Sequence, residues 1–87
     1  MEIKRNTIIY FLNIFSETNS LKLTINKLLK KYNKNVINDI IVYCYNNGLI
    51  SKIHDNYINT KGHYVIQYID KKVHITQYGY NLLAYYL

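Results

Sequence analysis

The sequence predicts one α+β domain over residues 1–87, with three helices, a small antiparallel sheet and a last helix. Three observations predict this class. Apolar residues recur with helical spacing as far as residue 47, β-prone segments follow Gly48, and a helical pattern returns after Thr76. A chain of 87 residues suffices for one small domain and is too short for two.

The first helix is expected from Lys4 to Glu17. Its apolar residues stand at positions i, i+3, i+4 and i+7, which form one stripe of an α-helix: Ile8, Phe11, Leu12 and Phe15. Further apolar residues widen this face. We therefore expect a second neighbour for the helix, either the C-terminal helix or another subunit.

A second helix is expected to begin at Thr24, whose hydroxyl can cap it. One side of this helix is apolar, and lysines recur on another side: Lys27, Lys30, Lys31 and Lys34. Such a row is ordinarily a solvated face. The absence of an interleaved acid favours contact with phosphates. Both interpretations stay open.

The connection from Lys31 to Lys34 is short, as in a helix-turn-helix arrangement. Asn33 or Asn35 is expected to cap the third helix, over residues 35–47, and glycine at position 48 to end it. Four residues should point into the core: Ile37, Ile40, Ile41 and Cys44. The outward residues are mostly polar: Lys34, Asn35, Asn38, Asp39, Val42, Tyr43 and Asn46.

The expected sheet follows the third helix. Its strand candidates are rich in β-branched and aromatic residues: Leu49–His54, Tyr64–Ile69 and Val73–Thr76. Turn-forming residues at Asn59–Gly62 should make the tip of a β wing. Thr76 should then cap a last helix that ends near Tyr86.

The chain is strongly basic, with a formal net charge of +6 and eleven tyrosines. Such a charge favours polyanions or acidic surfaces as partners, and the alternative is that it serves solubility alone. The five acids are scattered, and only Asp55 has a histidine beside it, so no catalytic constellation is expected and the protein is not expected to be an enzyme.

One cysteine and three separated histidines argue against a zinc site, and no cofactor is expected. The first residues are too polar for a signal peptide, and no apolar run is long enough to span a bilayer. We therefore expect an intracellular, cytoplasmic protein without a membrane partner. Nothing in the sequence indicates a small-molecule effector.

Two segments carry a resemblance to a known family. Tyr45-Asn46-Asn47-Gly48-Leu49-Ile50 resembles the end of the recognition helix of winged helix-turn-helix domains, and Ile75-Thr76-Gln77-Tyr78-Gly79-Tyr80-Asn81-Leu82-Leu83 resembles their strand-to-helix closure. The chain looks most like small archaeal and archaeal-virus members. Some of these dimerise through the C-terminal helix.

The resemblance implies double-stranded DNA as the partner, with helix 35–47 in the major groove and the wing, residues 50–76, on the backbone. Base-facing residues would be Asn35, Asn38, Asp39 and Tyr43, of which Asn38 can pair bidentately with adenine. Phosphates would be held by Lys27, Lys30, Lys31 and Lys34, with Lys61 and His63 at the wing. If DNA-binding, the protein would be nucleoid-associated.

The resemblance also implies a homodimer that acts as a transcription regulator or small chromatin-type protein. Its interface would include Tyr78, Leu82, Tyr85 and Tyr86, and it would place two recognition helices about 34 Å apart. For Tyr85 and Tyr86 the alternative is packing on the first helix. The third helix departs from the family pattern because it has no arginine and contains Asp39. The alternative function is therefore a protein–protein interaction module without DNA binding.

Overall fold

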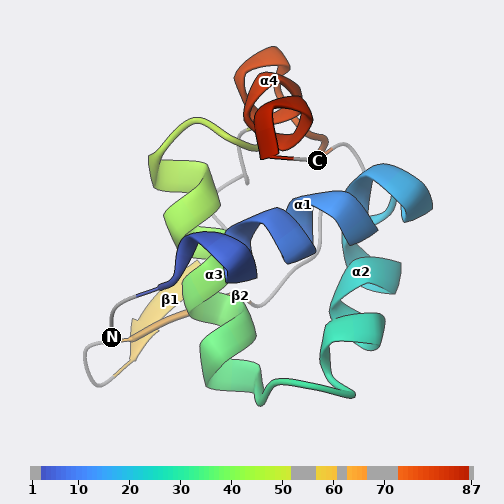
Figure 1. The fold of residues 1–87 in the computed structure, drawn as a ribbon. Coiled ribbons are helices and arrows are strands. Elements are labelled where there is room, and N and C mark those ends of the chain that lie inside the picture. The colour runs from blue at the N-terminus through green and yellow to red at the C-terminus, as the bar shows by residue number, and fades with distance from the viewer. Residues whose placement is uncertain (1–2, 52–56, 61–62, 67–72, 87) are drawn as a thin grey trace.

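The computed structural model describes the backbone of residues 3–51, 57–60, 63–66 and 73–86, and the side chains of residues 3–51 and 73–86. The described helices are α1 (Arg5–Thr18), α2 (Leu21–Leu28), α3 (Lys34–Asn46) and α4 (Gln77–Tyr86), as Figure 1 shows. Two short strands, β1 (Tyr57–Thr60) and β2 (His63–Ile66), pair antiparallel. In this part of the chain, no helix is both long enough and apolar enough to cross a membrane.

The expected α+β class is wrong. Among residues 3–51 and 73–86, 71% are helical and none belongs to a strand. A lone pair of four-residue strands adds little stability by itself, so the helices define this domain. Within the expected wing, residues 50–76, the described residues form one pair of strands and no third strand. Part of the wing, including Lys61 in its predicted tip, lies outside the described residues.

The alternating apolar residues that predicted these strands lie in extended segments that pack on the helices. Where strands Leu49–His54 and Val73–Thr76 were expected, the described residues form one isolated bridge between Ile50 and Ile75. Their apolar residues are buried in the same core as the helices: Leu49, Ile50, Val73 and Ile75. Alternation over so few residues indicates burial without establishing that a sheet continues from it.

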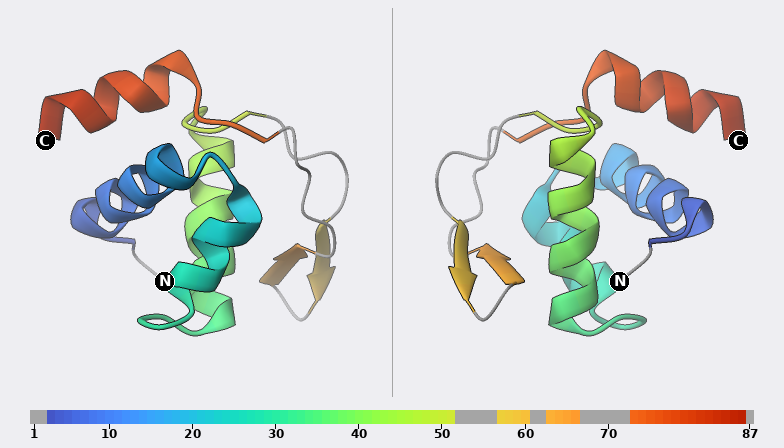
Figure 2. Two further views of the ribbon diagram at one scale, coloured as in Figure 1. Left: turned by 90° about the vertical axis from the view of Figure 1, so that its right-hand side faces the viewer. Right: turned by 90° about the vertical axis from the view of Figure 1, so that its left-hand side faces the viewer.

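Helix α1 lies at the centre of the fold and packs against α2, α3 and α4. Figure 2 shows α1 and the β1–β2 pair on opposite sides of α3. The predicted stripe of α1 is confirmed as its buried face, and Ile14 joins it: Ile8, Phe11, Leu12, Ile14 and Phe15. Helix α4 supplies the second neighbour that the wide face requires.

Ser20, rather than Thr24, caps α2. The Ser20 hydroxyl accepts a hydrogen bond of 3.3 Å from the Leu23 amide, so the cap of α2 lies four residues earlier than expected. Thr24 is fully buried inside the helix, where its hydroxyl donates to the Ser20 carbonyl at 2.8 Å and lies 2.8 Å from the Thr18 hydroxyl. Thr24 therefore joins the end of α1 to α2.

The boundaries of α3 agree with the expected range, residues 35–47, to within one residue at each end. The Asn33 side chain accepts a hydrogen bond of 2.9 Å from the Val36 amide, which confirms one of the two predicted caps. Gly48 has φ +71°, a left-handed conformation that glycine adopts without steric cost, and it ends the helix as predicted. The four residues expected in the core are buried: Ile37, Ile40, Ile41 and Cys44.

Helix α4 is anchored through its cap. The Thr76 hydroxyl accepts from the Gly79 amide at 3.0 Å, as expected of a capping residue, and donates to the Gly48 carbonyl at 2.6 Å. The backbone of Gly79 approaches Leu49 so closely that a Cβ would collide with the Leu49 carbonyl and stand 2.7 Å from Ile75. The first turn of α4 therefore packs directly against Gly48 and Leu49, the residues that follow α3.

Candidate nucleic-acid interface

The predicted basic stripe is broken by the end of α2. This helix ends at Leu28, so Lys27 lies on its last turn, Lys30 and Lys31 lie in the connection, and Lys34 begins α3. All four side chains are exposed. The lysines thus gather around the junction of two helices instead of following one helical face.

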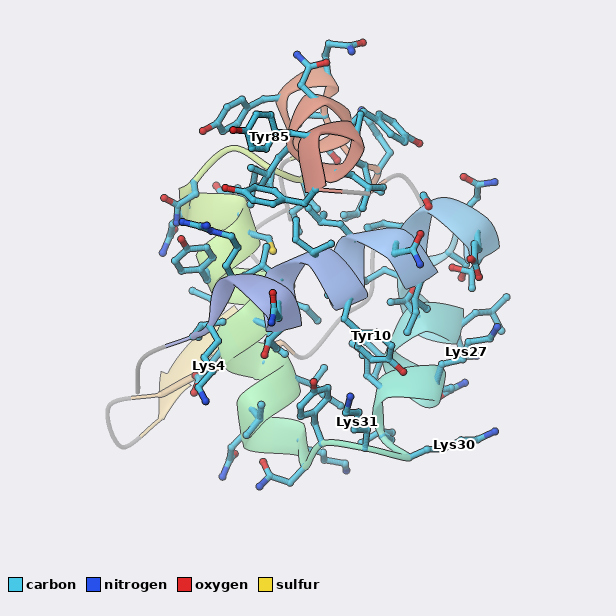
Figure 3. The ribbon with its side chains drawn as sticks, in the orientation of Figure 1. Lys4, Tyr10, Lys27, Lys30, Lys31 and Tyr85 are labelled. Carbon is cyan, nitrogen blue, oxygen red and sulfur yellow. The ribbon has the colours of Figure 1, made fainter. Side chains whose placement is uncertain are left out.

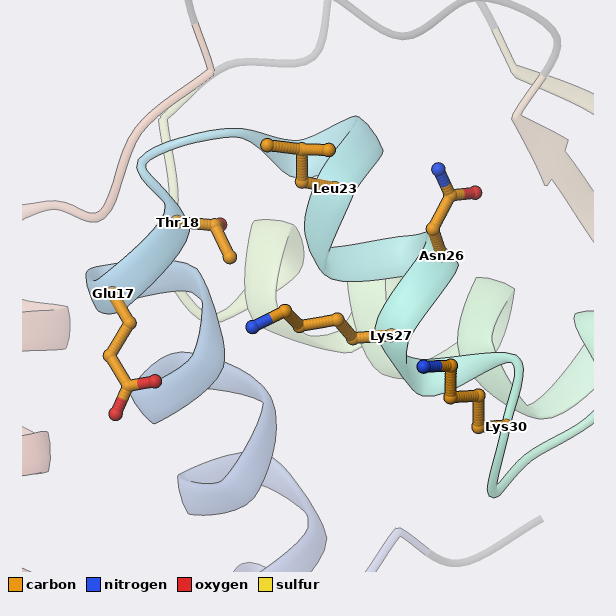
Figure 4. A pocket seen from close by; sticks show the side chains of 6 residues that line it. All are labelled: Glu17, Thr18, Leu23, Asn26, Lys27 and Lys30. Atoms are coloured by element: carbon orange, nitrogen blue, oxygen red, sulfur yellow. The ribbon is translucent and has the colours of Figure 1, made fainter.

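Lys27 and Lys30 line a shared hollow of about 360 Å³ between the end of α1 and α2 (Figure 4). Its other lining residues are Glu17, Thr18, Leu23 and Asn26. Sequence reasoning missed Leu23 and Asn26. Their spacing was a usable signal, since residues three and four positions apart share a helical face.

Lys31 is held by the protein's own aromatic rings. Its ammonium nitrogen lies 4.6 Å from the ring centroid of Tyr10 and 5.6 Å from that of Tyr32. These two rings meet edge to face, with centroids 6.4 Å apart. In Figure 3, Lys31 turns toward Tyr10, whereas Lys30 projects away from the molecule. Figure 4 shows Lys27 extending from α2 toward the end of α1. Lys31 therefore differs from the other lysines although it is also exposed.

The predicted base-facing residues of α3 do not share one environment. Asn35 is exposed beside the basic junction, while Asn38 and Asp39 are half-buried. Tyr43 is 41% exposed, but it lines a second hollow near the other end of α3. At 1.5 Å per residue, Tyr43 stands roughly 13 Å along the helix axis from Lys34. The structure thus keeps Asn35 beside the lysines and separates Tyr43 from them.

The first turn of α3 contains no acidic residue. A helix N-terminus carries partial positive charge from its unpaired amides, and Lys34 adds a full charge at the same place. The nearest acid along α3 is Asp39, more than one turn further on. The start of α3 is therefore an electropositive part of the surface.

The other predicted site residues lie at the wing and on α4, and the structure describes the side chains of those on α4 only. Lys61 lies outside the described residues, and for His63 the structure describes only the backbone, in β2. On α4, Tyr78 and Tyr85 are 60% and 79% exposed, and Leu82 is half-buried. Tyr86 instead faces α1, where the Arg5 guanidinium stands 5.0 Å from its ring centroid.

Cys44 is enclosed in the core, and burial raises the pKa of its thiol to about 12. A protonated thiol in apolar surroundings is inert, so Cys44 behaves as a small apolar side chain. In the described ranges, no group of three histidine, cysteine or acidic residues is arranged to hold a metal ion.

No protein-family model, curated protein or solved structure matches this chain. The resemblance to winged helix-turn-helix domains therefore stays a prediction from two sequence segments. The exposed lysines around the junction of α2 and α3 are therefore the main guide to function.

Proposed function

We propose that the protein binds double-stranded DNA mainly through phosphate contacts made at the junction of α2 and α3. The observation that carries the proposal is the exposure of Lys27, Lys30 and Lys34 around this junction. Lysines of this kind neutralise phosphates and release counterions, which favours binding to any duplex. The partial charge at the start of α3 adds to their attraction.

Three features of α3 favour weak sequence discrimination. Asn35 is the exposed amide beside the lysines, Asn38 and Asp39 are half-buried, and Tyr43 faces another hollow. Discrimination between bases requires side chains that reach base edges, whereas phosphate contacts only position the protein. The proposal is therefore closer to a small chromatin-type protein than to a regulator with a defined operator.

A homodimer is part of this proposal. Tyr78, Leu82 and Tyr85 follow one another at helical spacing on α4, and the two tyrosines are mostly exposed. Two exposed aromatic rings on either side of a half-buried leucine are typical of an interaction surface. Pairing two copies through α4 would double the number of lysines available to one duplex.

Fluorescence polarisation tests the proposal with several unrelated duplexes of about one helical turn, measured at two or more salt concentrations. We expect similar affinity for all duplexes. The logarithm of the binding constant should fall with the logarithm of salt concentration, with a slope of about 3 per protomer for three phosphate contacts. The absence of binding at low salt would eliminate the DNA proposal.

A matched pair of variants separates specific lysines from net charge. Replacing both Lys27 and Lys30 by Gln should weaken binding and reduce the salt slope by about 2. Replacing Lys4 and Lys22 by Gln removes the same charge from two other exposed positions, just before α1 and in the first turn of α2. Equal losses in the two double variants would mean that the junction has no special role.

The second candidate function is a protein-interaction module without DNA binding. It is favoured by the exposure of Tyr78 and Tyr85, since tyrosine is enriched in protein interfaces. This candidate predicts that the chain fails to bind any duplex at low salt but still associates through α4.

A further inference from the structure

A second hollow, of about 410 Å³, lies between the start of α1, the end of α3 and α4. This volume falls in the range of sites for small organic ligands. The hollow is hereafter the α4 groove, and its lining residues come from all three helices and the chain after α3: Ile3, Arg5, Ile8, Tyr43, Asn47, Leu49, Tyr78, Leu82 and Tyr86.

The α4 groove combines an apolar base with one cation. Ile8 and Leu49 are buried in the core beneath it, and Leu82 is half-buried at its side. Among the described residues that line the groove, Arg5 is the charged one and none carries a carboxylate. The groove therefore offers apolar contact together with an attraction for negative charge.

The position of Arg5 is restricted by Tyr86. Its guanidinium carbon lies over the Tyr86 ring, 5.0 Å from the centroid, at the distance of a cation–π contact. A guanidinium has five N–H donors in its plane, and a cation–π contact with a ring uses its charge without requiring those donors to bond to the ring. A planar carboxylate can accept two such parallel hydrogen bonds.

We propose that the α4 groove binds a small organic carboxylate with a flat apolar body, held at its charged end by Arg5. The apolar body would lie on Ile8, Leu49 and Leu82, and the tyrosine rings would flank it. The phenolic and amide groups at the groove supply further hydrogen-bonding partners for polar substituents. This inference does not depend on DNA binding, because the groove is separate from Lys27 and Lys30.

Tyr43 links the α4 groove to α3. It lines the groove from the same helix whose first turn carries Lys34. A ligand in the groove would therefore contact α1, α3 and α4 at once. Such a ligand would stabilise the packing of these helices by binding the folded state.

The test uses indole-3-acetate as the probe and its neutral analogue indole-3-acetamide as the control. Backbone amide signals of the ¹⁵N-labelled protein are followed by NMR during each titration. Saturable shifts are expected at Leu49 and Leu82, with a dissociation constant on the order of 0.1 mM, as for small ligands in open sites. Thr24, in the interface of α1 and α2, should not shift. The amide should bind at least about tenfold more weakly, because it lacks the charge-assisted bond.

Two matched substitutions test whether Arg5 is the cation that binds the carboxylate. Arg5→Gln should weaken carboxylate binding by about tenfold, whereas Lys4→Gln, an equal loss of charge at the neighbouring exposed position, should leave it almost unchanged. Arg5→Lys should restore part of the affinity. Thermal unfolding of each variant shows whether the fold is intact.

Three outcomes would overturn the proposal. These are the absence of saturable shifts up to about 5 mM probe, equal binding of the carboxylate and the amide, and equal effects of the Arg5 and Lys4 substitutions. Tyr78 and Leu82 also belong to the proposed dimer interface, so the titrations are run at a protein concentration low enough to give the monomer. Shifts at Leu49 that follow protein dilution without any probe would identify a second copy as the occupant of the groove, and this would reject the small-ligand proposal.

Discussion

Gly79, in the first turn of α4, lies directly against the backbone carbonyl of Leu49, at the exit from α3. Thr76 binds the neighbouring Gly48 carbonyl at 2.6 Å and caps α4 with the same hydroxyl. The two segments that carry the resemblance are thus in contact in space. Their residues form one joint, whose geometry requires the small size of Gly79.

The first prediction concerns this joint. Gly79→Ala should destabilise the protein by about 1–3 kcal/mol, because the new Cβ would collide with the Leu49 carbonyl and crowd Ile75. Alanine normally stabilises a helix by about 1 kcal/mol relative to glycine, so the expected sign is reversed. Urea unfolding followed by circular dichroism measures the change.

Gly48→Ala is the matched control for Gly79. It meets no atom within 4 Å but must adopt φ +71°, which should cost about 1 kcal/mol through backbone strain alone. A stabilising effect of Gly79→Ala would show that the close approach to Leu49 does not exist.

The second prediction separates Lys31 from Lys30. Lys31→Ala should lower the stability by about 0.5–1 kcal/mol, because it removes the contact of the ammonium with the Tyr10 and Tyr32 rings. Its effect on the salt dependence of DNA binding should be small. Lys30→Ala should do the reverse, with little change in stability and a salt slope smaller by about 1. Unfolding and polarisation titrations of both variants provide the comparison, and identical slopes would contradict it.

The third prediction concerns association through α4. Tyr85→Ser should shift a dimer toward the monomer in sedimentation equilibrium, because Tyr85 is 79% exposed and belongs to the proposed interface. Tyr80→Ser, at another exposed tyrosine of the same helix and outside the proposed stripe, should leave the dimer intact. A wild-type protein that is monomeric at high concentration would rule out the interface altogether.

The fourth prediction concerns Cys44. Because burial raises the pKa of its thiol to about 12, the folded protein should resist a thiol reagent that attacks the thiolate, and the reaction should require unfolding. The unfolded thiol ionises near its ordinary pKa of 9.0 while the folded one stays protonated. Stability contributed by this group is therefore complete below about pH 9 and is lost as the pH rises toward 12. Rapid labelling of the native protein at pH 8 would contradict this protection.

The helical part of the fold could be predicted because its signals are local. The apolar stripe of α1, the Asn33 and Thr76 caps and the left-handed Gly48 each follow from residues within a few positions of one another. Thr24 shows the limit of such reasoning. A threonine before an apolar run reads as a cap, and only the packing of α1 on α2 reveals that its hydroxyl is buried between them.

The site was harder to predict because it depends on contacts between distant residues. Lysine spacing could not reveal that Lys31 turns toward Tyr10, since Tyr10 lies 21 positions earlier in the chain. Arg5 is the one arginine of the sequence and lies far from Tyr86 along the chain. The contact between their side chains depends on the packing of α4 on α1. The β pattern failed at Val73–Thr76 and in the described part of Leu49–His54 for the same reason, because burial among helices and burial in a sheet require similar residues.

Ser51, which follows α3, and His74, which precedes α4, are paired by hydrogen bonds. The Ser51 amide donates to the His74 carbonyl at 2.7 Å, and the His74 amide donates to the Ser51 hydroxyl at 2.9 Å. The neighbouring residues Ile50 and Ile75 form an isolated β-bridge, and both side chains are buried in the core. The two ends of the segment between Ser51 and His74 are therefore fixed beside each other. We expect the four helices to tolerate only insertions in this segment that keep the buried Val73 and the packing of β2 on α3.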